Sequence, residues 1–198
     1  MNKIIIILAA SLIFSGCATK TVNINKSTDK GKAVLSLDYR DFDLAVKETV
    51  QSLLDSGTFK KADGNRYVIA TGEIVNDTTQ RIDTRQLMSS VEEQLIASGQ
   101  VDMTSVIGDS TDKLLTDSRA LRDSDEFNKE TVLQKGQLVS PELSFSGKIF
   151  ERVLSYDKKT NQVEYYIQLI VTDLKTGLRF WQKQIQILKR GSNKAPIW

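Results

Sequence analysis

Few residues in this sequence could do chemistry. The chain has no histidine, which excludes Ser-His-Asp and Cys-His catalysis as well as metal sites built on imidazole. Its densest acidic group lacks the alternating ligands, turn glycine and closing glutamate of a calcium loop. We interpret that group as a solvated surface, and we predict no catalytic residue, no metal site and no small-molecule substrate. The group comprises Asp109, Asp112, Asp117, Asp123 and Asp125.

A lytic enzyme is one open alternative. Two carboxylates that flank a glycosidic bond can hydrolyse it, and any two of the 25 acids could meet in the fold. No pattern of residues indicates a cleft around such a pair, and the 11 glycines form no phosphate-binding loop. The sequence therefore favours a protein that binds a partner over an enzyme.

The one cysteine lies at the end of a hydrophobic leader. Lys3 gives a positive start, and an apolar stretch follows over residues 4–14. A helix of that length spans roughly 16 Å, about half of a ~30 Å hydrocarbon core, which is typical of a signal peptide. The small residues Ser15 and Gly16 precede Cys17, an arrangement that resembles the bacterial lipobox. The alternative is a soluble secreted protein with a chance cysteine.

The lipobox resemblance implies a diacylglycerol and an N-acyl chain on Cys17, and no other cofactor. Two or more acyl chains hold a protein firmly, because each buried methylene adds about 0.8 kcal/mol of membrane affinity. Ala18 stands where an aspartate usually retains such proteins at the inner membrane, so the resemblance implies the periplasmic face of the outer membrane. We expect a signal peptide at 1–16, the lipidated cysteine and a flexible tether at 17–36, and one periplasmic globular domain at 37–198.

The charge of the chain is balanced overall but unevenly distributed. The 27 basic and 25 acidic residues give a net charge of +2, which argues against a nucleic-acid partner. Residues 73–130 have a net charge of −7, and residues 141–198 have one of +5. Such a domain could orient on a charged partner. Ordinary surface charge that follows the order of the elements is an equally good interpretation.

Hydrophobic periodicity predicts a βαβ unit after a first helix. The helix runs from Asp41, its expected N-cap, to Ser56, with Gly57 in a left-handed conformation after it. A strand over 66–75, apolar on both alternating sets, is expected to be central and covered on both faces. A second helix begins after a capping box over 83–86 and ends before Gly99, and a short strand follows over 101–107.

The remaining sequence predicts a polar segment and then an antiparallel sheet. Residues 109–135 are expected to form two short helices, one around Leu114 and one after Ser124. Turns at 156–161 and 175–177 separate three alternating strands, which form a meander with a Gln- and Lys-rich outer face. The expected inward residues are Leu143, Phe145, Ile149, Val153, Val163, Tyr165, Ile167, Leu169, Val171, Trp181, Ile185 and Ile187.

Three stretches resemble the LpoB-type lipoproteins, outer-membrane activators of a class A penicillin-binding protein. They are Asp38-Tyr39-Arg40-Asp41-Phe42, Val75-Asn76-Asp77-Thr78-Thr79 and Leu174-Lys175-Thr176-Gly177-Leu178-Arg179-Phe180-Trp181. The resemblance covers most of Leu37 to Leu188. It implies an α+β fold with a mixed sheet and flanking helices, similar to the amino-terminal domain of the Tol-Pal translocation protein. It also implies no catalysis, but docking on an accessory domain of a bifunctional peptidoglycan synthase, whose activity rises.

Composition alone suggests where a partner would bind. Arginine together with an aromatic residue in irregular structure is typical of interfaces, although a helix pair that closes on itself has the same composition. The short tether without proline favours an alternative function, a scaffold lipoprotein that supports an outer-envelope or flagellar assembly. The predicted partner-binding residues are Asn76, Asp77 and Thr78 in one turn and Arg119, Arg122 and Phe127 in the polar segment.

Overall fold

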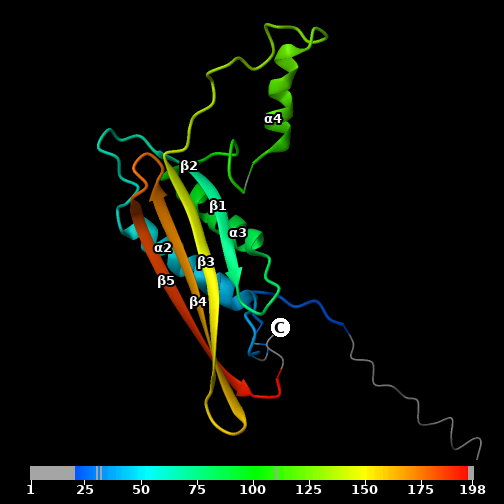
Figure 1. Cartoon of the computed structure of the whole chain (residues 1–198), viewed down its shortest axis with the longest axis vertical. Helices are drawn as coiled ribbons and strands as arrows, with labels where there is room; N and C mark the ends of the chain where they lie inside the picture. The colour runs from blue at the N-terminus through cyan, green and yellow to red at the C-terminus, as the bar shows by residue number, and fades with distance from the viewer. Residues whose placement is uncertain (1–20, 30, 32, 110, 196–198) are drawn as a thin grey trace, which may run out of the picture. The chain divides into compact units, whose positions relative to one another are not determined.

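The computed structural model describes residues 21–29, 31, 33–109 and 111–195 (Figure 1). Cys17 and the expected signal peptide lie outside these residues. The chain divides into two units, Met1–Ala33 and Val34–Trp198. In the described part of the first unit, a turn forms around Asn25, whose backbone oxygen accepts from the amide of Asp29 at 2.9 Å. No helix among the described residues is long and apolar enough to cross a membrane.

The second unit contains a five-stranded mixed sheet in the order β2-β1-β3-β4-β5. The strands β1 (Tyr67–Asp77) and β2 (Val101–Met103) are parallel, and β1 is also parallel to β3 (Leu143–Ser155). Strands β4 (Thr160–Asp173) and β5 (Arg179–Ser192) continue from β3 as an antiparallel meander. This arrangement confirms the predicted α+β fold with a C-terminal three-stranded meander.

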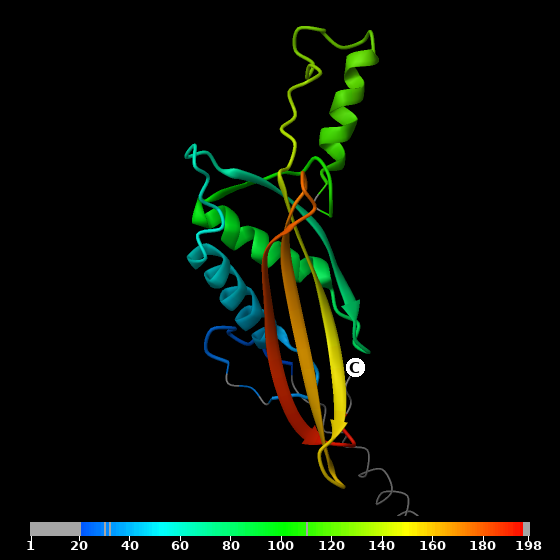
Figure 2. The same ribbon diagram turned by 60° about the vertical axis from the view of Figure 1, so that its left-hand side comes forward.

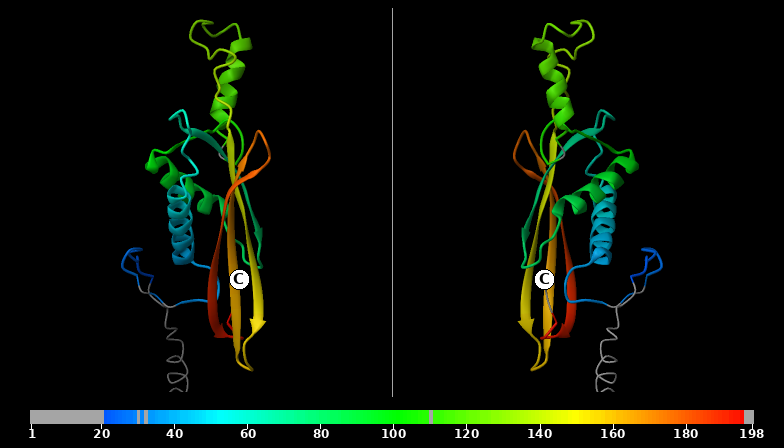
Figure 3. Two further views of the ribbon diagram at one scale, coloured as in Figure 1. Left: turned by 90° about the vertical axis from the view of Figure 1, so that its left-hand side faces the viewer. Right: turned by 90° about the vertical axis from the view of Figure 1, so that its right-hand side faces the viewer.

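Helices α2 (Tyr39–Asp55) and α3 (Thr84–Ser98) pack against one face of the sheet (Figure 3). Helix α3 connects the parallel strands β1 and β2, as the predicted βαβ unit requires. The core lies between these helices and the sheet, where the inward residues of β4 are fully buried. Those residues are Val163, Tyr165, Ile167, Leu169 and Val171.

Both helices are capped by aspartates. The sequence predicted Asp41 as the N-cap of α2, but the structure shows that the N-cap is Asp38. Asp41 lies at the third helical position, where its side chain accepts a hydrogen bond from the amide of Asp38 at 2.7 Å. The two aspartates thus form a reciprocal capping box. Asp83 caps α3 as predicted, and Gly99 ends that helix with φ +65°.

Several predicted boundaries are wrong. Strand β2 ends at Met103, and the amide of Thr104 donates the last hydrogen bond that follows on from its pairing with β1. Strand β1 is covered on both faces only over 69–71, since Val75 is 46% exposed. The segment 109–135 forms α4 (Lys113–Ala120) and a short 3-10 helix, η1 (Leu121–Asp123), but no helix after Ser124.

Two expected core residues are less buried than predicted. Val153 is 44% exposed, because the far end of the β3–β4 hairpin extends beyond the helices (Figure 2). Trp181 is partly buried and packs against the edge of the core. The remaining inward positions of the meander are buried as the alternation predicts.

Candidate functional site

The first predicted site segment is a turn held by its own side chains. The Asn76 side-chain nitrogen donates to the backbone oxygen of Gln80 at 2.8 Å, and the Thr78 hydroxyl donates to the Asn76 side-chain oxygen at 2.8 Å. These bonds shape the connection from β1 to α3 and direct the side chain of Gln80, which is 7% exposed, into the core. Asn76 and Thr78 therefore have a structural role in this turn.

The same turn is attached to strand β3. Asp77 forms a salt bridge with Lys148, with 2.6 Å between the carboxylate oxygen and the ammonium nitrogen. The backbone amide and the hydroxyl of Thr79 both donate to Glu151, at 3.0 and 2.7 Å. Most of the polar groups of this segment are thus used inside the domain, which leaves few of them for a partner.

The second predicted site segment belongs to an excursion from the sheet, residues 104–142, which we call the arm. It extends beyond the helix-covered part of the sheet in all views (Figures 1, 2 and 3). Both of its ends are bonded to β1: Thr104 donates to the oxygen of Ile69 at 2.9 Å, and Glu142 donates to that of Val68 at 2.8 Å. Asp109 also donates to the oxygen of Thr71 at 2.8 Å.

Gly108 is the residue that permits this close approach to β1. Its φ is +90°, and a Cβ atom built on it would lie 2.0 Å from the backbone oxygen of Thr71. No side chain fits at that distance, and few residues other than glycine adopt this conformation. The arm is therefore fixed to the edge of β1 by a position that requires glycine.

Arg119, Arg122 and Phe127 all lie in the arm. The Nε atom of Arg119 is buried without a hydrogen-bond partner, whereas that of Arg122 donates to the backbone oxygen of Arg119 at 3.0 Å. Phe127 is 43% exposed in the loop that follows η1. The arm is bonded to the first half of strand β1, whereas the turn at 76–78 lies at the end of that strand. The structure therefore does not bring the turn and the arm, the two predicted site segments, together (Figure 1).

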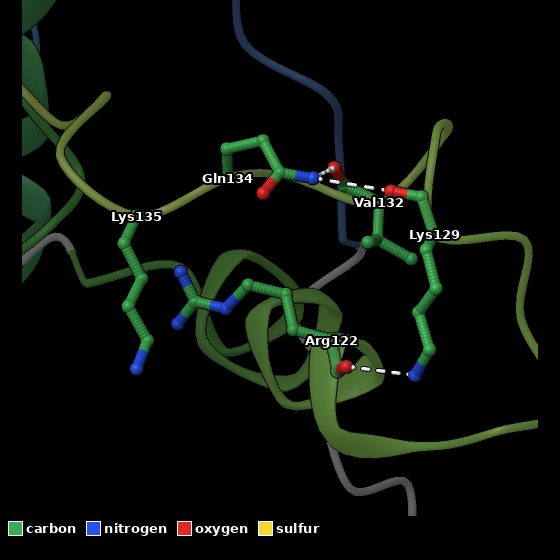
Figure 4. Close-up of a pocket in the computed structure, with 5 residues that line it drawn as sticks. All are labelled: Arg122, Lys129, Val132, Gln134 and Lys135. Carbon is green, nitrogen blue, oxygen red and sulfur yellow. Dashed lines mark hydrogen bonds between the residues drawn. The ribbon is translucent and has the colours of Figure 1, made fainter.

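The arm contains a cleft of about 370 Å³ lined mainly by cationic side chains (Figure 4). Its lining residues are Arg122, Lys129, Val132, Gln134 and Lys135. The Lys129 ammonium donates to the backbone oxygens of Arg122 and Ser124, at 3.0 and 2.6 Å, and so connects the loop to η1. The side-chain nitrogen of Gln134 donates to the oxygens of Lys129 and Val132, both at 3.1 Å.

A second cleft, of about 450 Å³, lies where the arm joins the sheet. Tyr67, Ile107 and Leu174 are among its lining residues. Phe180 contacts Tyr67 edge-on, with 5.6 Å between the ring centroids, and Leu178 lies in the adjoining β4–β5 turn. We call Tyr67, Ile107, Leu174, Leu178 and Phe180 the root patch. Apart from Tyr67, these side chains are between 39% and 67% exposed.

Charged contacts fix the backbone around the root patch. The Lys61 ammonium lies 2.6 Å from a Glu142 carboxylate oxygen and 4.5 Å from the centre of the Tyr67 ring. The hydrogen bond from Lys61 lowers the pKa of Glu142, which therefore stays ionised at neutral pH. In the β4–β5 turn, Asp173 accepts from the amides of Lys175 and Thr176 at 2.8 and 2.9 Å, which lowers its pKa too. These contacts thus fix the backbone segments that carry the apolar side chains of the root patch.

Sequence reasoning did not find the root patch. The turn at 175–177 was predicted, but its flanking apolar residues Leu174, Leu178 and Phe180 were not recognised as exposed. The concentration of these apolar residues around one turn could have indicated an exposed apolar surface, because hairpin turns usually carry polar side chains. What the sequence could not show is that the arm and Tyr67 lie beside that turn.

The sheet face opposite the helices is polar, as predicted. Gln182, Gln184 and Gln186 of β5 are exposed there. Phe150 and Tyr166 stack on each other across β3 and β4 with 5.0 Å between their ring centroids. Among the residues that the structure describes, no group of three or more acidic, cysteine or histidine side chains is arranged to hold a metal ion.

A family model for the peptidoglycan-synthase activator LpoB matches residues 41–187, which span α2 to β5. The chain belongs to the LpoB family. This family is described as one of activators of an enzyme. The family match confirms the resemblance seen in the sequence and includes both the arm and the root patch.

Solved structures with a similar fold include members of the LpoB family. The LpoB C-terminal domain from Salmonella enterica has a TM-score of 0.41 at 13% identity, covering 74% of this chain and 98% of that one. The corresponding domain from Escherichia coli has a TM-score of 0.45 at 10% identity, with the same coverage of 74% and 98%. The lipoprotein GNA1162 from Neisseria meningitidis has a TM-score of 0.35 at 9% identity, covering 66% and 86%. No curated protein matches the sequence directly.

Proposed function

We propose that this protein is a non-catalytic lipoprotein of the outer membrane that binds and activates a bifunctional peptidoglycan synthase. The observation that carries the proposal is the LpoB family match over residues 41–187, which includes nearly the whole folded unit. The sequence adds the absence of histidine, which removes the commonest catalytic groups. The partner is an accessory domain of the synthase, a penicillin-binding protein.

The membrane attachment in this proposal is the lipid on Cys17. Acylation there would hold the protein on the periplasmic face of the outer membrane, and the tether at 17–36 would keep the domain near it. A Cys17→Ser variant is expected to leave the membrane fraction for the soluble periplasmic fraction. Retention of that variant in the membrane would contradict lipid anchoring.

We place the docking surface at the root patch rather than at the turn around Asn76. Exposed apolar side chains gathered in one place are typical of protein interfaces, and aromatic residues contribute strongly to their affinity. The root patch combines Tyr67, Phe180 and exposed leucines. The salt bridge between Lys61 and Glu142 fixes the backbone next to them. Arg119, Arg122 and Phe127 would contribute from the adjoining arm, whereas Asp77 lies at the other end of β1 and would not take part.

Activation without catalysis requires differential affinity. The protein can raise the rate of the synthase only if it binds the active conformation more tightly than the inactive one, by about 1.4 kcal/mol for each tenfold shift. A rigid docking surface favours such discrimination because little conformational entropy is lost on binding.

The test is a glycan polymerisation assay with the cognate synthase and the chain from Lys20 to Trp198. Wild type is expected to raise the rate, and Leu178→Gln is expected to weaken both binding and activation about tenfold, as the loss of an apolar interface anchor does. Leu188→Gln is the matched control, because it makes the same substitution at a leucine outside the root patch. Leu188 lies on the sheet face away from the helices and is 58% exposed, against 67% for Leu178. An unchanged rate with folded wild-type protein would contradict activation, and equal losses in both variants would contradict this docking surface.

The scaffold function is the second candidate. The tether between Cys17 and the folded unit contains no proline and spans at most about 3.5 Å per residue, which keeps the domain near its own membrane. If the protein supports an envelope or flagellar assembly, it should co-isolate with that assembly and leave polymerisation rates unchanged. The polymerisation assay therefore separates the two functions.

A further inference from the structure

The cationic cleft of the arm results from a separation of charges within the arm. Residues 113–135 contain five basic and five acidic residues, so this segment has no net charge. Three of the five bases line the cleft, and none of the acids does. The acids Asp123 and Glu126 are exposed outside the lining, whereas the fully exposed Asp125 carboxylate lies 3.5 Å from the Lys129 ammonium. The positive charge of the cleft therefore comes from Arg122 and Lys135, although the segment around it is neutral.

Two of the three cations have polar groups that the described structure does not use. Arg122 is held through its Nε atom, which donates to Arg119, and no described carboxylate pairs with its terminal nitrogens. Lys135 has no hydrogen bond or salt bridge with a described residue. In Figure 4 the Arg122 guanidinium extends towards the Lys135 side of the cleft. Lys129, by contrast, donates to the backbone oxygens of Arg122 and Ser124 and forms a salt bridge with Asp125 at 3.5 Å, so it has a structural role in the wall of the cleft.

We infer that this cleft binds an organic anion through a carboxylate or phosphate group. A guanidinium fork beside an ammonium suits the planar oxygens of either group. A volume of about 370 Å³ exceeds what a bare ion requires and lies in the usual range for small-ligand sites. Val132 provides an apolar wall for the body of the ligand. This site includes none of the root patch and shares only Arg122 with the proposed docking surface, and the inference does not rest on the proposed function.

The test is a titration of the full chain in detergent, followed by backbone amide and arginine Nε resonances. Inorganic phosphate, glycerol 1-phosphate and N-acetylglutamate are the probes, and they distinguish free phosphate, a phosphate monoester and a carboxylate. We expect at least one organic probe to give saturable shifts confined to residues 119–135, with a Kd below about 10 mM that rises with salt.

The variants show whether the cleft itself binds. Arg122→Gln and Lys135→Gln are each expected to weaken binding about tenfold, because each removes a charged hydrogen bond. Lys135 makes no hydrogen bond or salt bridge with a described residue, so its variant separates binding from folding. Lys158→Gln, in the β3–β4 turn, removes the same charge elsewhere and should bind as wild type does. The inference is overturned if no probe saturates below that Kd, if phosphate alone binds, or if Lys158→Gln weakens binding equally.

Discussion

The side-chain nitrogen of Gln80 lies 2.5 Å from the hydroxyl oxygen of Tyr165, although 85 residues separate the two in sequence. The Tyr165 hydroxyl in turn donates to the backbone oxygen of Leu35 at 2.9 Å, and the Gln80 side-chain oxygen accepts from the amide of Leu37 at 3.0 Å. Burial raises the pKa of Tyr165, so the hydroxyl stays protonated and can donate. This buried network connects the chain before α2 to strand β4, which lies between β3 and β5 in the sheet.

We predict that Tyr165→Phe lowers the free energy of unfolding by about 1–3 kcal/mol, because it leaves buried polar groups at Leu35 and Gln80 without a partner. Urea denaturation measures the change. Tyr166→Phe is the control, since Tyr166 lies on the opposite sheet face and bonds to Glu164 at 2.8 Å in a partly exposed position. A loss at Tyr166 equal to that at Tyr165 would contradict the importance of burial.

From the pKa of Asp38 we predict how the free energy of unfolding depends on pH. The hydrogen bond from the Arg40 side chain lowers the pKa of Asp38 in the folded state, with further contributions from the Arg40 amide and the charge of Lys189. The stabilisation is therefore complete above the unfolded pKa of about 3.9 and is lost as pH falls through the lower folded value. Asp38→Asn keeps an N-cap residue but should flatten the dependence of unfolding free energy on pH below about 4. An unchanged slope in this variant would assign the dependence to other carboxylates.

The attachment of the arm predicts a difference between two glycine substitutions. Gly108 and Gly136 both have positive φ, +90° and +80°, but only a Cβ at Gly108 would meet another atom within 4 Å. Gly136→Ala should cost about 1–2 kcal/mol, from backbone strain alone. Gly108→Ala should cost a further 1–3 kcal/mol or so, from the clash with Thr71. Urea denaturation and hydrogen exchange at the Asp109 amide measure both changes, and equal costs would show that the close approach to Thr71 is dispensable.

Local patterns predicted the elements well where each residue's environment follows from its neighbours in sequence. The alternation of Val163, Tyr165 and Ile167 identified the buried face of β4, and Asp83 and Gly99 marked the two ends of α3. The helix expected after Ser124 does not form, and residues 124–139 lie in the arm outside the core, where no apolar face can be buried to stabilise a helix. Asp41 was predicted from the sequence as the N-cap of α2, and only the reciprocal hydrogen bonds of the structure show that Asp38 has this role.

The candidate surfaces depended on contacts that no local pattern contains. Arg122 is the one predicted partner-binding residue that lines the cleft, and the cleft also requires Lys129 and Lys135 to lie beside η1. The root patch requires Tyr67 to meet Phe180, which is 113 positions later in the chain. Long-range packing creates the root patch, and an irregular local conformation of residues 122–135 creates the cleft, so residue type alone predicts neither surface.

The attachment of Leu35 to Tyr165 also has a mechanical consequence. Tension on the preceding chain would first load the Leu35–Tyr165 and Leu37–Gln80 hydrogen bonds, while the buried side chains of Leu35 and Leu37 resist extraction from the core. Only after these yield would force reach α2. A pulling load therefore enters the fold within strand β4, where the neighbouring strands β3 and β5 share it.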